Sequence, residues 1–156
     1  MKKKILTVGL LLIFTLGIMS GCGNENKTPD NTSLIYKDGI YSAEDETFSE
    51  GGWKEKVSIT VENGNIISAY WTAVHKDGGD DKYVQSENGQ YGMKEKANAK
   101  AEWHEQADLV TDYLVENQSV SGIKIKDGGK TDSVSGASIS VGKFVELADK
   151  ALTKAK

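Results

Sequence analysis

The chain has 156 residues and a formal net charge of −4, which argues against nucleic acid as a partner because phosphate backbones bind basic surfaces. It contains no arginine, so the bidentate guanidinium clamp that many proteins use for phosphate is absent. Cys22 is its only cysteine, so a folded domain of about 120 residues must be stabilised by packing, without internal disulfides.

The first residues have the pattern of a segment that is removed from the mature protein. Three lysines at positions 2–4 precede an apolar run from Ile5 to Met19 that is short for a membrane span, and Ser20-Gly21 stand directly before Cys22. This pattern predicts a lipoprotein signal peptide over residues 1–21 and a lipidated Cys22 that anchors the protein to the extracytoplasmic face of the cell membrane. An ordinary signal peptide with an incidental cysteine is the alternative. Cleavage removes three lysines and no acid, so the net charge of −4 becomes −7.

A tether is predicted to follow the anchor. Residues 22–35 are polar and include Pro29, the only proline of the chain. Such a composition favours an extended, flexible linker. The sequence therefore predicts one domain at residues 36–156 that is held at a distance from the membrane.

The first part of this domain has the patterns of antiparallel strands. Asp38-Gly39 predicts a turn into a strand, and Val57, Ile59 and Val61 alternate with polar residues as in a half-buried strand. Asn63-Gly64 follows at once, and this dipeptide between two apolar runs is the strongest short signal for a hairpin. The returning strand, from Ile66 to Val74, is partly apolar on both faces, so we expect cover on both sides of the sheet there.

The segment from Lys76 to Gln90 is acidic and rich in glycine, which predicts a solvated loop. Its carboxylates at Asp77, Asp80 and Asp81 raise the alternative of a calcium site. The spacing lacks the ordered ligands and the central glycine of an EF-hand loop, so the loop interpretation is favoured.

The second half of the domain has helical periodicity. From about Lys94 the chain is predicted to turn helical, with an apolar stripe at Trp103, Ala107, Val110 and Leu114. A short strand over residues 119–126, a turn at residues 127–129 and a second helix from about Val141 to Ala155 follow, the last with an inner face of Phe144, Ala148, Ala151 and Leu152. The order of elements predicts an α+β fold: a mainly antiparallel sheet with a β-hairpin and two principal helices packed against it.

One run of small residues lies just before the second helix. Ser135 and Ser138 bracket Gly136-Ala137, whose small side chains let another macromolecule approach the backbone closely. Ser138 is a candidate N-cap of the following helix, at a position where phosphate is also favoured. On the residues alone, a serine-rich loop with a helix cap is the simpler interpretation.

The run from Asp132 to Ser138 resembles the Asp-x-x-(Ser/Thr)-Gly-Ala-(Ser/Thr) signature of FMN-binding domains, a family related to the flavin-carrying domain of sodium-pumping NADH:quinone reductase. In that family a magnesium-dependent flavin transferase joins FMN, taken from FAD with loss of AMP, to the last hydroxyl through a phosphoester. The resemblance implies that Ser138 carries the FMN and that Asp132, Ser135, Gly136 and Ala137 form the recognition motif. Threonine is the more familiar acceptor, and both residues supply a hydroxyl nucleophile.

Further segments resemble the extracytoplasmic lipoprotein branch of this family: Asp38-Gly39-Ile40-Tyr41, Gly52-Trp53, Tyr91-Gly92-Met93 and Trp103-His104-Glu105-Gln106. The resemblance implies an electron carrier rather than an enzyme with its own substrate. It implies a membrane quinol-linked donor and extracellular acceptors such as ferric iron or other flavoproteins. Tyr91, Met93, Trp103 and His104 are then candidates to contact the flavin, because aromatic rings stack on it and an imidazole hydrogen-bonds to it. Helix packing for Trp103 and a capped imidazole for His104 are the alternatives.

Two other classes of function remain open on the sequence. A lipid-anchored module without flavin would bind a peptide or glycan through Trp53, Tyr70 and Trp71. A hydrolase would need a serine nucleophile paired with a base, and neither His75 nor His104 has a recognisable serine partner.

Overall fold

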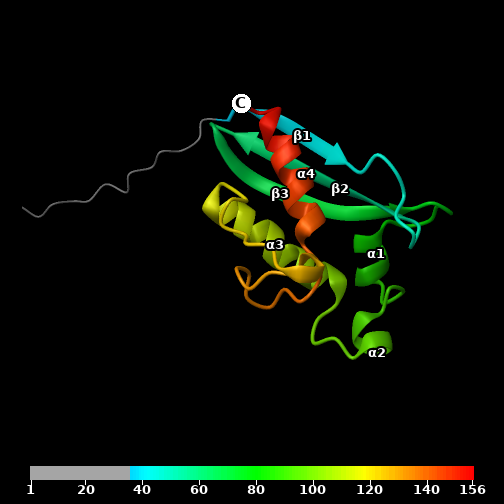
Figure 1. The fold of residues 1–156 in the computed structure, drawn as a ribbon. Helices are drawn as coiled ribbons and strands as arrows, with labels where there is room; N and C mark the ends of the chain where they lie inside the picture. Colours follow the sequence, from blue (N-terminus) through cyan, green and yellow to red (C-terminus); the bar gives the residue numbers. More distant parts are fainter. Residues whose placement is uncertain (1–35) are drawn as a thin grey trace, which may run out of the picture. The chain divides into compact units, whose positions relative to one another are not determined.

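The computed structural model describes residues 36–156; the predicted signal peptide, Cys22 and the tether lie outside the described residues. Three antiparallel strands form a sheet in the order β1-β2-β3. Their bounds are β1 Gly39–Glu44, β2 Trp53–Glu62 and β3 Asn65–His75 (Figure 1). No helix within residues 36–156 has the length and apolarity that crossing a membrane requires.

The predicted hairpin between β2 and β3 is confirmed. Glu62 pairs with Asn65, which leaves Asn63 and Gly64 as a two-residue turn with φ angles of 52° and 74°. Positive φ at both positions is the requirement of a type I′ turn, which Asn-Gly meets at low cost. The side chain of Asp38 accepts a hydrogen bond from the Gly64 N–H at 2.9 Å and joins the start of the domain to this turn.

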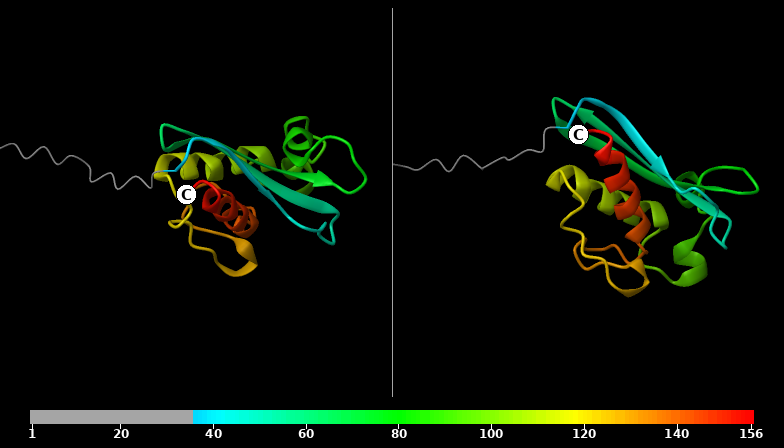
Figure 2. Two further views of the ribbon diagram at one scale, coloured as in Figure 1. Left: turned by 90° about the horizontal axis from the view of Figure 1, so that it is seen from above. Right: turned by 45° about the horizontal axis from the view of Figure 1, so that its top comes forward.

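One face of the sheet carries the core. Val57, Ile59 and Val61 are buried on β2, as their alternation predicts. The helices α3, Trp103–Asn117, and α4, Gly142–Thr153, cover this face, with α3 against β3 and α4 against β1 and β2 (Figure 2). The Trp71 ring, on β3, lies 5.0 Å from the Trp103 ring and 5.2 Å from the Phe144 ring, so one residue of the sheet contacts both helices.

Both predicted helices have the inner faces that the sequence indicates. The stripe residues of α3 and the inner face of α4 are buried without exception: Trp103, Ala107, Val110, Leu114, Phe144, Ala148, Ala151 and Leu152. A capping box between Glu102 and Glu105 begins α3, since each side chain accepts a hydrogen bond from the other residue's backbone N–H. The predicted α+β class, with a hairpin and two principal helices against an antiparallel sheet, is confirmed.

The other face of β3 lacks the cover that its apolar residues suggested. Ile67, Tyr70 and Val74 are 46%, 42% and 43% exposed, so the expectation of cover on both sides is wrong at these positions. Thr72 is the exception on that face: it is buried, and its hydroxyl accepts a hydrogen bond from the Tyr83 N–H at 3.1 Å.

The segment predicted as a solvated loop contains a helix. This helix, α1, is Lys82–Glu87, and Asp81 caps it by accepting the Val84 N–H at 3.0 Å. The loop prediction is wrong for these residues because six residues are too few to show helical periodicity. Contacts with β3 and α3 stabilise this short helix. A second short helix, α2, is Met93–Ala97.

The predicted strand at residues 119–126 is also wrong, since this segment has no strand in the structure. Side-chain oxygens replace a strand partner there: the Lys124 N–H donates to Ser133 Oγ at 3.0 Å, and Thr131 Oγ1 donates to the Lys124 carbonyl at 2.8 Å. The predicted turn at residues 127–129 is the 3-10 turn η1, Asp127–Gly129. This irregular segment loops beside α3 before it enters α4 (Figure 1).

Candidate functional site

Ser138 lies in the irregular segment before α4 and is exposed. It does not cap the helix: Val141 is the N-cap residue of α4, so the capping prediction is wrong. Between Ser138 and the first residue of α4, the side chains of Ile139 and Val141 are both buried in the core.

Gln106, on α3, holds Ser138 in place. Its side chain is 1% exposed, and Oε1 accepts three hydrogen bonds: from Ser138 N–H at 2.7 Å, from Ser138 Oγ at 2.9 Å and from Ile139 N–H at 3.2 Å. Nε2 donates to the Ala101 carbonyl at 3.0 Å. With its proton directed at Gln106, the Ser138 hydroxyl leaves its lone pairs free on the exposed side. Gln106 is not among the site residues that the sequence predicts, although it lies in the segment Trp103-His104-Glu105-Gln106 that resembles the lipoprotein branch.

Gly136 gives the run its shape. Its φ of 89° lies in the region that favours glycine, and a Cβ at this position would lie 2.8 Å from Leu109 Cδ1. Ala137 is buried and its N–H donates to the Val134 carbonyl at 3.3 Å, which closes a turn. Gly136 and Ala137 are therefore small for reasons of fold as well as access.

Asp132 and Ser135, the two polar residues that are predicted to serve recognition, are exposed. Asp132 forms an ion pair with Lys126. The structure thus presents both side chains at the surface of the segment that carries Ser138.

A cavity of about 450 Å³ opens beside Ser138. We call it the Ser138 cavity; it is lined by Asn98, Ala99, Lys100, Ala101, Gln106, Gly136, Ala137 and Ser138. Its volume falls in the range of about 300–1,000 Å³ that is typical of small-molecule sites. Lys100 is the one charged residue of this lining.

A second cavity, of about 180 Å³, shares three stretches of chain with the Ser138 cavity and also includes Glu55 of β2 and Lys82 of α1. We call it the aromatic cavity; it is lined by Glu55, Lys82, Tyr91, Met93, Trp103, Ile139 and Ser140. Three of the four residues predicted to contact a flavin, Tyr91, Met93 and Trp103, therefore share one cavity. Both cavities draw on the segment around Met93 to Ala101, on the first turn of α3 and on residues 136–140.

Lys82, the first residue of α1, is a buried cation in this cavity. It is 9% exposed, and its Nζ lies 4.6 Å from the Trp103 ring centroid, 5.0 Å from Tyr91 and 5.8 Å from Trp53. Burial lowers the pKa of Lys82, and the nearby charge of Glu55 opposes this change. Burial also raises the pKa of Glu55, whose Oε2 accepts the Trp71 Nε1–H at 2.9 Å. Neither Lys82 nor Glu55 is among the site residues that the sequence predicts.

His104 lines neither cavity. The His104 backbone N–H donates to Ser86 Oγ at 2.9 Å, and the ring Nδ1 lies 2.9 Å from the same oxygen. His104 therefore has a serine partner, contrary to the sequence-based expectation. Ser86 is 1% exposed, which closes it to a substrate and leaves no hydrolytic pair here. This contact instead joins α1 to α3 and fixes the position of Lys82.

The residues of the alternative binding module are separated in the structure. Tyr70 and Trp71 are neighbours on β3 and point to opposite faces, with Trp71 in the core and Tyr70 partly exposed. Trp53 packs on the His75 ring with a centroid distance of 4.8 Å. These three aromatic rings do not form one surface.

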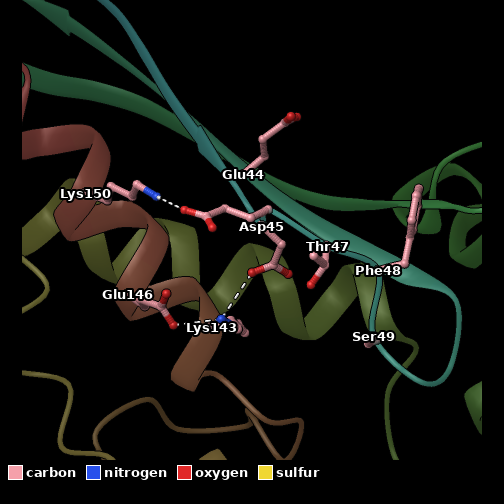
Figure 3. A pocket seen from close by; sticks show the side chains of 9 residues that line it. Glu44, Asp45, Thr47, Phe48, Ser49, Lys143, Glu146 and Lys150 are labelled. Atoms are coloured by element: carbon pink, nitrogen blue, oxygen red, sulfur yellow. Dashed lines mark hydrogen bonds and ion pairs between the residues drawn. The ribbon is translucent and has the colours of Figure 1, made fainter.

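A third cavity, of about 420 Å³, lies between α4 and the loop that joins β1 to β2. Lys143 bridges it with ion pairs to Asp45 at 3.1 Å and Glu146 at 2.8 Å (Figure 3). These carboxylates raise the pKa of Lys143, with Glu146 the larger cause. None of the predicted site residues lines this cavity, and its paired charges account for its polar character.

Known proteins similar to this chain are found among solved structures. A solution NMR structure of a protein from Clostridium thermocellum is 55% identical, with a TM-score of 0.59, and the match covers 77% of this chain and 92% of that one. A crystal structure of a protein from Clostridium perfringens is 27% identical, with a TM-score of 0.60, and the match covers 78% and 89%. No family model and no curated protein matches the chain.

Proposed function

The chain belongs to the same family as the Clostridium thermocellum protein, and we propose that it is a lipid-anchored flavoprotein that carries FMN on Ser138 and transfers electrons outside the cytoplasm. A membrane quinol-linked donor reduces it, and extracellular acceptors such as ferric iron or other flavoproteins oxidise it. A lipid on Cys22 holds it at the membrane. FMN, when bound, supplies one- and two-electron chemistry that no side chain of this protein provides.

The observation that supports this proposal is the position of the Ser138 hydroxyl. It is exposed, it opens into the Ser138 cavity, and a buried glutamine fixes its proton. Attachment forms a bond from Ser138 Oγ to the FMN phosphorus of FAD as the pyrophosphate bond breaks; AMP leaves, and the transferase takes the serine proton. Ser138 needs no base of its own, in agreement with the absence of a histidine from this lining.

The residues present fit a phosphoester-linked flavin. The Ser138 cavity has the volume of a small-molecule site. Lys100 supplies a positive charge for the phosphoester in a chain without arginine. Trp103 and Tyr91 supply aromatic walls for a ring in the neighbouring aromatic cavity.

Coexpression of the mature chain with its flavin transferase tests the proposal. The denatured protein band should fluoresce as flavin, and the Ser138→Ala variant should not. Ser138→Thr should retain the label because it keeps the hydroxyl, and Ser68→Ala should retain it because Ser68 is exposed on β3 and lies outside the motif and both cavities. Fluorescence in Ser138→Ala contradicts the assignment of the acceptor. A wild-type chain that never gains flavin favours the ligand-binding module, for which the partly exposed Tyr70 is the first residue to test.

A further inference from the structure

The Lys82 side chain is largely buried, and its ammonium faces aromatic rings and an accessible space rather than a hydrogen-bond acceptor. Within residues 36–156 its Nζ makes no hydrogen bond and no ion pair within 4.0 Å, although Glu55 lines the same cavity. The Lys82 ammonium has three N–H donors. The rings of Trp103 and Tyr91 attract its positive charge, but they are not hydrogen-bond acceptors of the strength of an oxygen. These donors are open to the aromatic cavity.

The place of Lys82 in the chain makes this burial costly. It is the first residue of α1, where the helix dipole disfavours a cation. It is also fixed: Asp81 caps the helix, and Ser86 ties the same helix to His104 on α3. A cation that is held rigidly, with open donors and aromatic walls, has the chemistry of a site for a planar anion.

We propose that Lys82 binds the edge of the flavin ring that becomes negative on reduction, the N1 and C2 carbonyl edge, and thereby stabilises the reduced cofactor. This inference rests on the proposed function and names a second contact of the same cofactor, remote from the ester at Ser138. Uptake of two electrons and one proton leaves the ring with one negative charge, and a nearby cation favours that charged form. Burial lowers the pKa of Lys82, so an anion in the cavity returns it toward its ordinary range.

Four flavin-loaded chains test the assignment: wild type, Lys82→Met, Lys82→Arg and Glu55→Gln. Methionine keeps the aliphatic stem without the charge, arginine keeps the charge, and the Glu55 variant removes the neighbouring negative charge while an amide oxygen still accepts the Trp71 N–H. Intact mass first establishes how much flavin each chain carries. Anaerobic reduction by dithionite in the presence of a reference redox dye then gives the reduction equilibrium, and its pH dependence gives the pKa of the reduced ring.

Lys82→Met should lower the equilibrium constant for reduction at neutral pH by at least about fivefold, the effect of one unit charge about 4 Å away even in water-like surroundings. The pKa of the reduced ring should rise in that variant. Lys82→Arg should resemble wild type, and Glu55→Gln should shift the equilibrium in the opposite direction. An unchanged equilibrium in a fully loaded Lys82→Met chain overturns the inference and leaves the proposed function intact.

Two other outcomes also decide the matter. If Lys82→Met carries no flavin while Glu55→Gln does, Lys82 serves attachment, and its role toward the reduced ring is wrong. If the wild-type chain carries no flavin, the proposed function and this inference both fail, and the mass measurement alone reveals it.

Discussion

Replacing Gln106 by leucine removes the side chain that positions Ser138. Leucine has a similar size, so the change leaves hydrogen-bonding groups without partners rather than a large cavity. The Ile139 N–H is buried, and its loss of a partner costs about 1–3 kcal/mol. The Ser138 N–H and the Ala101 carbonyl border a cavity and take up water, so each adds about 0.5–1.5 kcal/mol.

The free energy of unfolding of Gln106→Leu should therefore fall by about 2–6 kcal/mol. Urea unfolding of the mature chain measures this loss, and with a typical slope the midpoint should fall by about 1–3 M. Gln90→Leu is the matched control, because Gln90 is exposed, and we expect a change within about 0.5 kcal/mol. Gln106→Glu keeps oxygen acceptors for Ser138 and Ile139 and should lose less than leucine does. A loss in Gln106→Leu no larger than that of the control refutes the positioning role.

Three further changes test the site. In urea unfolding, Gly136→Ala should lose about 1–2 kcal/mol for the backbone at its φ of 89° and a further amount for the displacement of Leu109. Gly128→Ala is the control: its φ is 70° and the space around it is open, so it should lose only the backbone cost. Equal losses in the two variants would exclude the Leu109 contact. The lowered pKa of Lys82 means that its own contribution to stability rises with pH just below pH 10.5, against the fall that Tyr70 and Tyr83 cause because their pKa values are raised to about 12. Stability should therefore fall more steeply with pH in Lys82→Met than in wild type, and equal slopes would contradict this origin. Trp103→Phe should shift the flavin absorbance while leaving attachment intact, and an unchanged spectrum would restrict Trp103 to core packing.

The parts of the fold that the sequence predicted are those in which local and tertiary preferences agree. Asn63-Gly64 meets the φ requirements of its turn without help from the rest of the domain. The stripes of α3 and α4 repeat over several turns, so a single face is defined before any partner is known. The α+β class follows from their order.

The parts that were missed depend on contacts with residues outside the segments themselves. Residues 82–87 form a helix because Asp81 caps them and because β3 and α3 pack on them, and a window of six residues has no periodicity of its own. The segment at 119–126 has strand-like composition, but the side chains of Thr131 and Ser133 take its backbone hydrogen bonds. Tertiary context thus overrides propensity in both segments.

The candidate site also has one part that the sequence predicted and one part that it did not. The motif from Asp132 to Ser138 is local, and so it was found in the sequence. Gln106 is 32 residues from Ser138, and Lys82 is brought to Trp103 only by the packing of α1. No spacing rule connects such residues, which is why the structure was needed to assign them.

Peptide mapping tests the central claim most directly. Trypsin cleavage after Lys130 and Lys143 releases one peptide, Thr131–Lys143, that contains Ser138 and the other hydroxyls of the motif. After coexpression with the flavin transferase, this peptide should gain the mass of FMN less water, and fragmentation should place the whole gain on Ser138. A gain on Thr131, Ser133, Ser135 or Ser140, or no gain in the wild-type chain, would contradict the account.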